Sequence, residues 1–107
     1  MNIIVTLPRS RKEVKEAAEK EAVRKKLKGF SWPIGRVPKE LREGDRVYVV
    51  DNNVINYYHT CVGINSTRKT VRVTGDTSRS LTLRCPKRRL NKPIPMAGFR
   101  GFMYADF

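Results

Sequence analysis

Strand-forming sequence fills almost the whole second part of the chain, and this feature limits the fold more than any other. From residue 46 onward, apolar runs rich in Val, Ile, Leu and Tyr are separated mainly by short turns. In residues 69–74 and 80–85 apolar residues alternate with Thr, Ser and Arg, a period that gives a strand one buried and one polar face. The pair Asn52-Asn53 tolerates the positive φ of a two-residue hairpin loop. We therefore expect a β-meander over residues 46–107.

The first part of the chain predicts one strand and one long helix. Residues 2–7 form a short β-branched run that a proline stops, which is typical of a strand. The tetrapeptide Ser10-Arg-Lys-Glu13 fits a capping box, and Gly29 suits the left-handed residue that follows a helix. The sequence thus predicts a helix over residues 11–28 and an irregular crossing segment over residues 29–45.

These elements indicate a single domain over residues 1–107, because 107 residues suit one hydrophobic core. The run over residues 54–64 keeps no single alternation, which predicts a bulge or bend within that strand. Five or six strands with one long N-terminal helix predict an α+β fold. We expect a small, strongly bent, mostly antiparallel sheet that closes into a β-barrel, with the helix covering an open end.

Several classes of protein find no support in the sequence. No apolar run approaches the roughly 20 residues that span a bilayer, and the N-terminus lacks the features of a secretory signal. Two cysteines and one histidine do not make a four-ligand zinc site, so we expect neither a metal nor a cofactor. Both cysteines lie in predicted strands, which is consistent with a reducing, cytoplasmic location.

Catalysis has little support. His59 is the only histidine, and Cys61 falls on the same face of the same predicted strand. A thiolate–imidazole pair would need a third, orienting group that the sequence does not reveal. Asp45, Asp51 and Asp76 sit in predicted turns, where aspartate is expected to bond the backbone. We expect a protein that is not an enzyme, with activity through His59 left open.

Charge is the strongest functional signal. The formal net charge is +13, and residues 46–107 hold 11 basic but only 3 acidic residues. Such an excess indicates a polyanionic partner. The candidate phosphate contacts lie on the predicted polar strand face and in a basic loop over residues 86–93. They are Arg68, Lys69, Arg72, Arg84, Lys87, Arg88, Arg89 and Lys92.

Aromatic rings would hold bases by stacking. Tyr57 and Tyr58 are consecutive, so at least one ring must face away from the core, and Trp32 in the crossing segment is a candidate wall of a base pocket. We expect a non-enzymatic nucleic-acid-binding module, with RNA first and DNA second. The alternatives are a small basic factor, viral or from a mobile element, that binds an acidic host protein, and a ribosome-associated protein. Base specificity and oligomeric state stay open.

One stretch carries a family resemblance. Glu43-Gly44-Asp45-Arg46-Val47-Tyr48-Val49-Val50, followed by Val54-Ile55 and Tyr57-Tyr58-His59, resembles the PUA-like superfamily, which includes the PUA, ASCH and EVE domains. The closing Gly101-Phe102-Met103-Tyr104 is similar to the aromatic last strand of such domains. The resemblance covers roughly residues 29–107. It implies a pseudo-barrel that binds RNA or inspects a base in a cleft. Some ASCH-type members are enzymes, but no catalytic set matches this chain.

Overall fold

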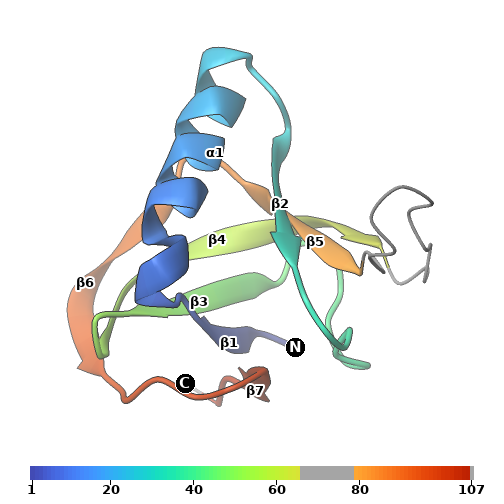
Figure 1. The fold of residues 1–107 in the computed structure, drawn as a ribbon. Helices are drawn as coiled ribbons and strands as arrows, with labels where there is room; N and C mark the ends of the chain where they lie inside the picture. The colour runs from blue at the N-terminus through green and yellow to red at the C-terminus, as the bar shows by residue number, and fades with distance from the viewer. Residues whose placement is uncertain (66–78, 107) are drawn as a thin grey trace.

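The computed structural model describes residues 1–65 and 79–106, which form an α+β fold of one helix and a mostly antiparallel sheet (Figure 1). A 3-10 turn, η1 (Arg9–Arg11), precedes the helix α1 (Lys12–Arg24). The strands are β1 (Ile3–Thr6), β2 (Gly29–Pro33), β3 (Arg46–Asp51), β4 (Val54–Asn65), β5 (Ser80–Arg84), β6 (Arg88–Pro95) and β7 (Phe102–Tyr104). The predicted strand over residues 69–74 lies outside the described residues.

The strand order is β2-β5-β4-β3-β1-β7, and β6 pairs with β4 beside this path. The long strand β4 takes β6 along its first part and β5 along its second part. β1 runs parallel to β3 and antiparallel to β7, so the second half of the chain is not a simple meander. Within the described residues β2 and β7 each pair with one neighbour, so the sheet is not closed there and the structure does not show the predicted barrel.

Two segments predicted as irregular are strands, which raises the strand count above the expected five or six. Within the predicted crossing segment, β2 pairs with β5 along its whole length, from Gly29 to Pro33. A Cβ on Gly29 would collide with the carbonyl oxygen of Leu83, so the missing side chain lets these backbones approach. The predicted basic loop becomes β6, and its two prolines are tolerated because an edge strand leaves amides unpaired.

The helix is shorter than predicted. It spans Lys12–Arg24, and Ser10 lies in η1, so no side chain caps the helix N-terminus and the capping box is not formed. At the other end Lys26, with φ of 55°, adopts the left-handed conformation that we assigned to Gly29. The helix therefore ends four residues before residue 28, the end that the sequence predicts.

The hairpin and the bulge are confirmed. Asn52 and Asn53 have φ of 56° and 63° and join β3 to β4. The register of β4 shifts between Ile55 and Tyr57 against β6, and between Cys61 and Gly63 against β5. These irregularities bend the strand, which allows one strand to serve two partners along the same edge.

Apolar residues fill both faces of the sheet. The inner face, which α1 covers, buries a cluster that includes Ile3, Val5, Val47, Val49, Phe30, Leu81 and Leu83. The outer face buries Ile4, Tyr48, Val50 and Ile55 beneath the C-terminal part of the chain. The alternation predicted for residues 80–85 is confirmed, since Leu81 and Leu83 are buried while Arg84 is exposed. The central strands therefore bury apolar side chains on both faces of the sheet.

Candidate nucleic-acid interface

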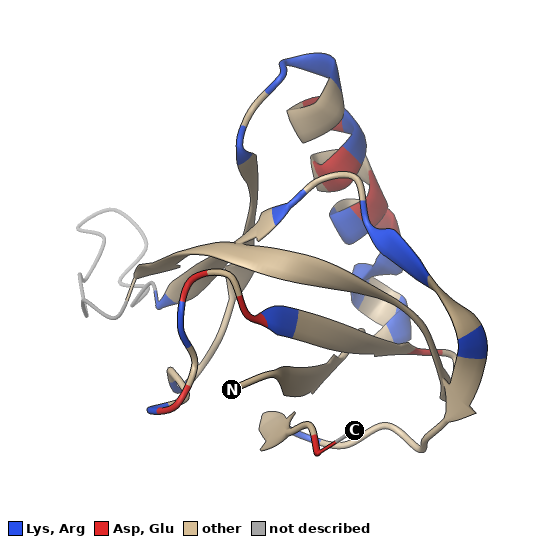
Figure 2. Ribbon diagram, turned by 180° about the vertical axis from the view of Figure 1, so that it is seen from behind, with Lys and Arg blue, Asp and Glu red and all other residues tan. Residues whose placement is uncertain are grey.

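Five of the predicted phosphate contacts lie together along the end of β5 and the strand β6. We call this group the basic ridge: Arg84, Lys87, Arg88, Arg89 and Lys92. Figure 2 shows Lys and Arg recurring along this part of the ribbon. Lys87 is half-buried and the other four side chains are exposed. In the described part of the chain no carboxylate lies within 4.0 Å of any of the five cations. Arg68, Lys69 and Arg72 lie outside the described residues.

The basic ridge follows an edge of the sheet and does not form the single polar face that the alternation predicts. In the register of β4 and β6, Arg88 lies opposite Tyr58 and Arg89 lies opposite Tyr57. Consecutive residues of a strand point to opposite faces, so these two guanidinium groups flank the edge on both sides. The prediction of a single polar face fails here because residues 88–95 form a strand, whereas the sequence predicted a loop.

The predicted role of Tyr57 in base stacking is not supported by its position. Its side chain is buried on the inner face, with 4% of its surface exposed. The Lys15 ammonium group donates a hydrogen bond of 3.1 Å to the Tyr57 hydroxyl, which in turn donates to Asp51 at 3.4 Å. The Nζ atoms of Lys15 and Lys87 lie 4.4 and 4.5 Å from the ring centroid. Burial raises the pKa of the Tyr57 hydroxyl, which therefore stays protonated.

Tyr58 is the tyrosine that faces outward. It is half-buried on the outer face, and its ring centroid lies 5.6 Å from that of Tyr48. The guanidinium carbon of Arg46 lies 4.4 Å from the centre of the Tyr58 ring, which is a cation–π contact. Sequence reasoning missed Arg46, because its approach to Tyr58 depends on the register of the β3–β4 hairpin. That register shifts between Val49 and Val50.

A buried polar cluster connects α1 to the start of the basic ridge. We define this buried cluster as Lys15, Glu19, Tyr57 and His59. Lys15 Nζ lies 3.8 Å from Glu19 Oε2, and the Lys87 backbone amide donates to Glu19 Oε1 at 3.3 Å. The ring atom Nδ1 of His59 lies 2.9 Å from the carbonyl oxygen of Arg84, which identifies Nδ1 as the protonated nitrogen. The cluster therefore fixes the corner between β5 and β6 from beneath.

The second ring nitrogen of His59 is left without a partner. Among the described residues no group forms a hydrogen bond with Nε2, and the nearest carboxylate oxygen, Glu19 Oε1, is 4.0 Å away. Burial lowers the pKa of His59, the Arg84 carbonyl raises it in part, and the charges of Lys15 and Lys87 lower it further. Burial likewise lowers the pKa of Lys15, although Glu19 opposes this shift. His59 is thus neutral at pH 7.

We expect the free energy of unfolding to fall as the pH is lowered from about 6.5, at up to about 1.4 kcal/mol per pH unit. The pKa of His59 is lower in the folded protein than in the unfolded chain, so below pH 6.5 the unfolded chain binds more protons. Urea titrations between pH 7 and pH 5 measure the slope, with His59→Phe as the comparison. A slope in the His59→Phe variant equal to that of the parent would contradict this assignment.

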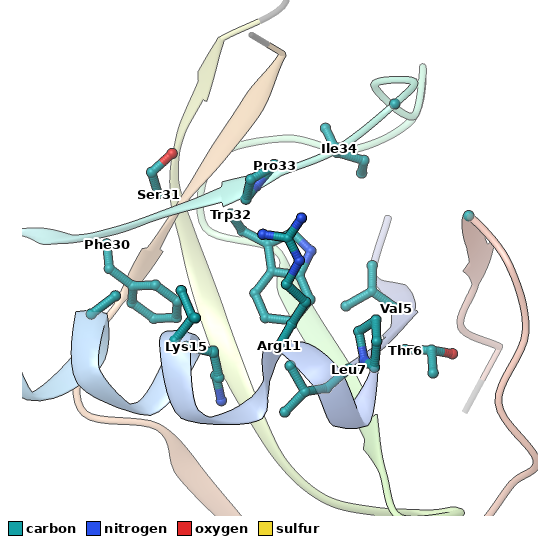
Figure 3. A pocket seen from close by; sticks show the side chains of 15 residues that line it. Val5, Thr6, Leu7, Arg11, Lys15, Phe30, Ser31, Trp32, Pro33 and Ile34 are labelled. Atoms are coloured by element: carbon teal, nitrogen blue, oxygen red, sulfur yellow. The ribbon is translucent and has the colours of Figure 1, made fainter. Parts of the chain in front are cut away.

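A cavity of about 510 Å³ lies between α1, β1 and β2 on the inner face (Figure 3). Trp32, Phe30 and Leu7 form apolar wall, Arg11 and Lys15 supply positive charge, and none of the described residues that line the cavity is acidic. Trp32 is half-buried and lies opposite the inward-facing Leu81, whereas Tyr58 faces the other side of the sheet. The structure therefore does not bring Trp32 and Tyr58 to one site, and contact of Trp32 with a base stays a prediction.

His59 and Cys61 lie on the same face, as their spacing indicates, but the thiol is not activated. Cys61 is fully buried, and its Sγ donates to the carbonyl of Gly63 at 3.4 Å. Burial raises the pKa of the Cys61 thiol, which favours the unreactive protonated form. In the part of the chain that the structure describes, no three His, Cys, Asp or Glu side chains are grouped to hold a metal ion.

Comparisons of the chain with protein-family models, with curated proteins and with solved structures return no match. None of the helices in residues 1–65 and 79–106 combines the length and the apolar content needed to span a membrane. The candidate interface consists of the basic ridge, the outward-facing ring of Tyr58 and the buried cluster beneath them.

Proposed function

We propose that the protein is a non-enzymatic nucleic-acid-binding module, with RNA as the first partner and DNA as the second, and that the basic ridge holds the phosphates. One observation carries the proposal: five cations gather along one edge, and none has a carboxylate within 4.0 Å in residues 1–65 and 79–106. Cations without a carboxylate partner repel one another, and a phosphate backbone relieves that repulsion while releasing its own counterions. Arg88 and Arg89 add planar donors that match phosphate oxygens.

Membership of the PUA-like superfamily, with its pseudo-barrel, is part of this proposal. Two features support it. Gly44, with φ of +96°, turns the chain into β3, where Val47 and Val49 are fully buried. The aromatic strand β7 then packs against β1. An acidic protein is the competing partner, because it would also bind the basic ridge, and the binding experiment below separates the two.

Binding to RNA is expected to weaken steeply with salt. If the basic ridge neutralises about five phosphates, log K falls against log salt with a slope of about −3.5 for single strands and about −4.5 for duplex DNA. Between about 50 and 200 mM salt this is a loss of roughly one hundred- to five hundred-fold. Filter binding to single-stranded RNA, duplex RNA and duplex DNA measures it. The double variant Arg88→Ala/Arg89→Ala should flatten the single-strand slope by about 1.4.

The matched control is Arg36→Ala/Lys39→Ala, which removes the same charge from two exposed positions after β2. This variant should keep most of the parent slope. An affinity that stays flat across the salt range would exclude the proposal. Saturable binding to an acidic protein, together with indifference to all three nucleic acids, would replace nucleic acid by protein as the partner.

A further inference from the structure

Three side chains cross the outer face from β3 to the basic ridge, and the third of them, Arg88, belongs to that ridge. Tyr58 lies in the middle strand β4, with Tyr48 opposite it on β3 and Arg88 opposite it on β6. Arg46 lies diagonally from Tyr58, with its guanidinium carbon 4.4 Å from the ring centroid. We call Arg46, Tyr58 and Arg88 the outer-face row. Both arginines are exposed, and in the described residues neither has a carboxylate within 4.0 Å.

The chemistry of the outer-face row suits an unpaired base. A nucleobase can stack through its own π face on an aromatic ring or on the plane of a guanidinium group, and this row holds both groups in contact. Cations on both sides of Tyr58 place phosphate-binding groups next to that surface. The half-buried Thr60 lies two residues after Tyr58 and opposite Arg46 in regular register, so it shares their face and offers a hydroxyl group to base edges.

We propose that the outer-face row stacks a base of single-stranded nucleic acid, with Arg46 as a contact residue that the charge pattern does not reveal. This inference rests on the proposed function and narrows its ligand to single strands. Bases inside a duplex are already stacked on one another and offer no free face. The site is set on three hydrogen-bonded strands, and Tyr48 packs against Tyr58 with ring centroids 5.6 Å apart, so the ring is held in place before the ligand arrives.

The test compares single-stranded RNA with a duplex of the same sequence. Tyr58→Leu should weaken single-strand binding by about 5- to 100-fold, while duplex binding and the salt slope stay at parent values. Tyr58→Phe keeps the ring and should bind as the parent does, which separates lost stacking from a damaged sheet. Arg46→Lys keeps the charge without the planar group and should weaken single-strand binding at an unchanged salt slope.

A single-stranded oligonucleotide containing 2-aminopurine provides a direct readout, because stacking on a ring quenches its fluorescence. We expect quenching by the parent and by Tyr58→Phe, but not by Tyr58→Leu. The emission of Trp32, the only tryptophan, should not change, because the cavity lies on the inner face. Quenched Trp32 emission with unaltered binding by Tyr58→Leu would overturn the inference and place the base in the cavity. Absence of all salt-dependent binding would instead reject the proposed function.

Discussion

Replacing Glu19 with alanine is expected to lower the free energy of unfolding by about 3–5 kcal/mol. Glu19 and Lys15 are both buried on the inner side of α1, at 9% and 6% exposure. Removal of the carboxylate leaves the Lys15 ammonium group inside the protein with the Tyr57 hydroxyl as its remaining hydrogen-bond partner in the described residues. It also deprives the Lys87 amide of its acceptor. Urea denaturation monitored by circular dichroism measures the change.

Glu13→Ala is the control for Glu19→Ala. Glu13 is on the same helix and carries the same charge, but it is exposed, so its removal should change the free energy of unfolding by no more than about 0.5 kcal/mol. A loss below 1 kcal/mol in Glu19→Ala would mean that Lys15 relaxes to solvent when its partner is removed. The buried cluster would then contribute little to the attachment of α1.

Replacing Gly29 with alanine is expected to cost about 3 kcal/mol or more. The new methyl group would overlap the carbonyl oxygen of Leu83 on the neighbouring strand. A backbone atom cannot rotate out of the way as a side chain can, so β2 would have to move away from β5. That movement would break the pairs of Phe30 and Trp32 with β5. The thermal midpoint should fall accordingly, and it can be followed by circular dichroism.

Gly35→Ala is the matched control for this substitution. Apart from Gly35 and its two chain neighbours, no described residue has an atom within 4 Å of the position that the Cβ would take, so the same chemical change meets open space. We expect its thermal midpoint to stay near that of the parent. If both variants melt at the same temperature, β2 is not held against β5 as closely as the structure shows.

Local signals predicted the parts of the fold that depend on neighbouring residues. The positive φ of Asn52 and Asn53 and the inward alternation of Leu81 and Leu83 follow from residue type and period. The strands β2 and β6 were missed, because each exists only by pairing with a strand distant in the sequence. The predicted capping box is not formed, because Ser10 lies in the 3-10 turn and the helix starts two residues later.

In the candidate site, one bulge determines whether Tyr57 or Tyr58 faces outward, and the sequence did not predict which of the two does. The loop pairs Asp51 with Val54 and Val50 with Ile55, and continuing that register would place Tyr57 opposite Tyr48 on the outer face. The shift between Val49 and Val50 places Tyr58 there instead and turns Tyr57 inward. The sequence itself gives the positions of the charged residues. The sequence does not give the register of β6 against β4, and this register places Arg88 and Arg89 on opposite sides of the sheet edge.

The position of β1 has a consequence for the order in which the protein can be completed. β1 lies between β3, which starts 43 residues later, and β7, whose residues 102–104 pair with residues 3–5. Because translation runs from the N-terminus, β1 is synthesised before either of its strand partners. During translation the apolar side chains of Ile3 and Val5 therefore stay without their neighbouring strands until β3 and β7 have been synthesised. β1 can therefore join the sheet only after β3 has been synthesised, and its second partner, β7, is the last of the described strands to be made.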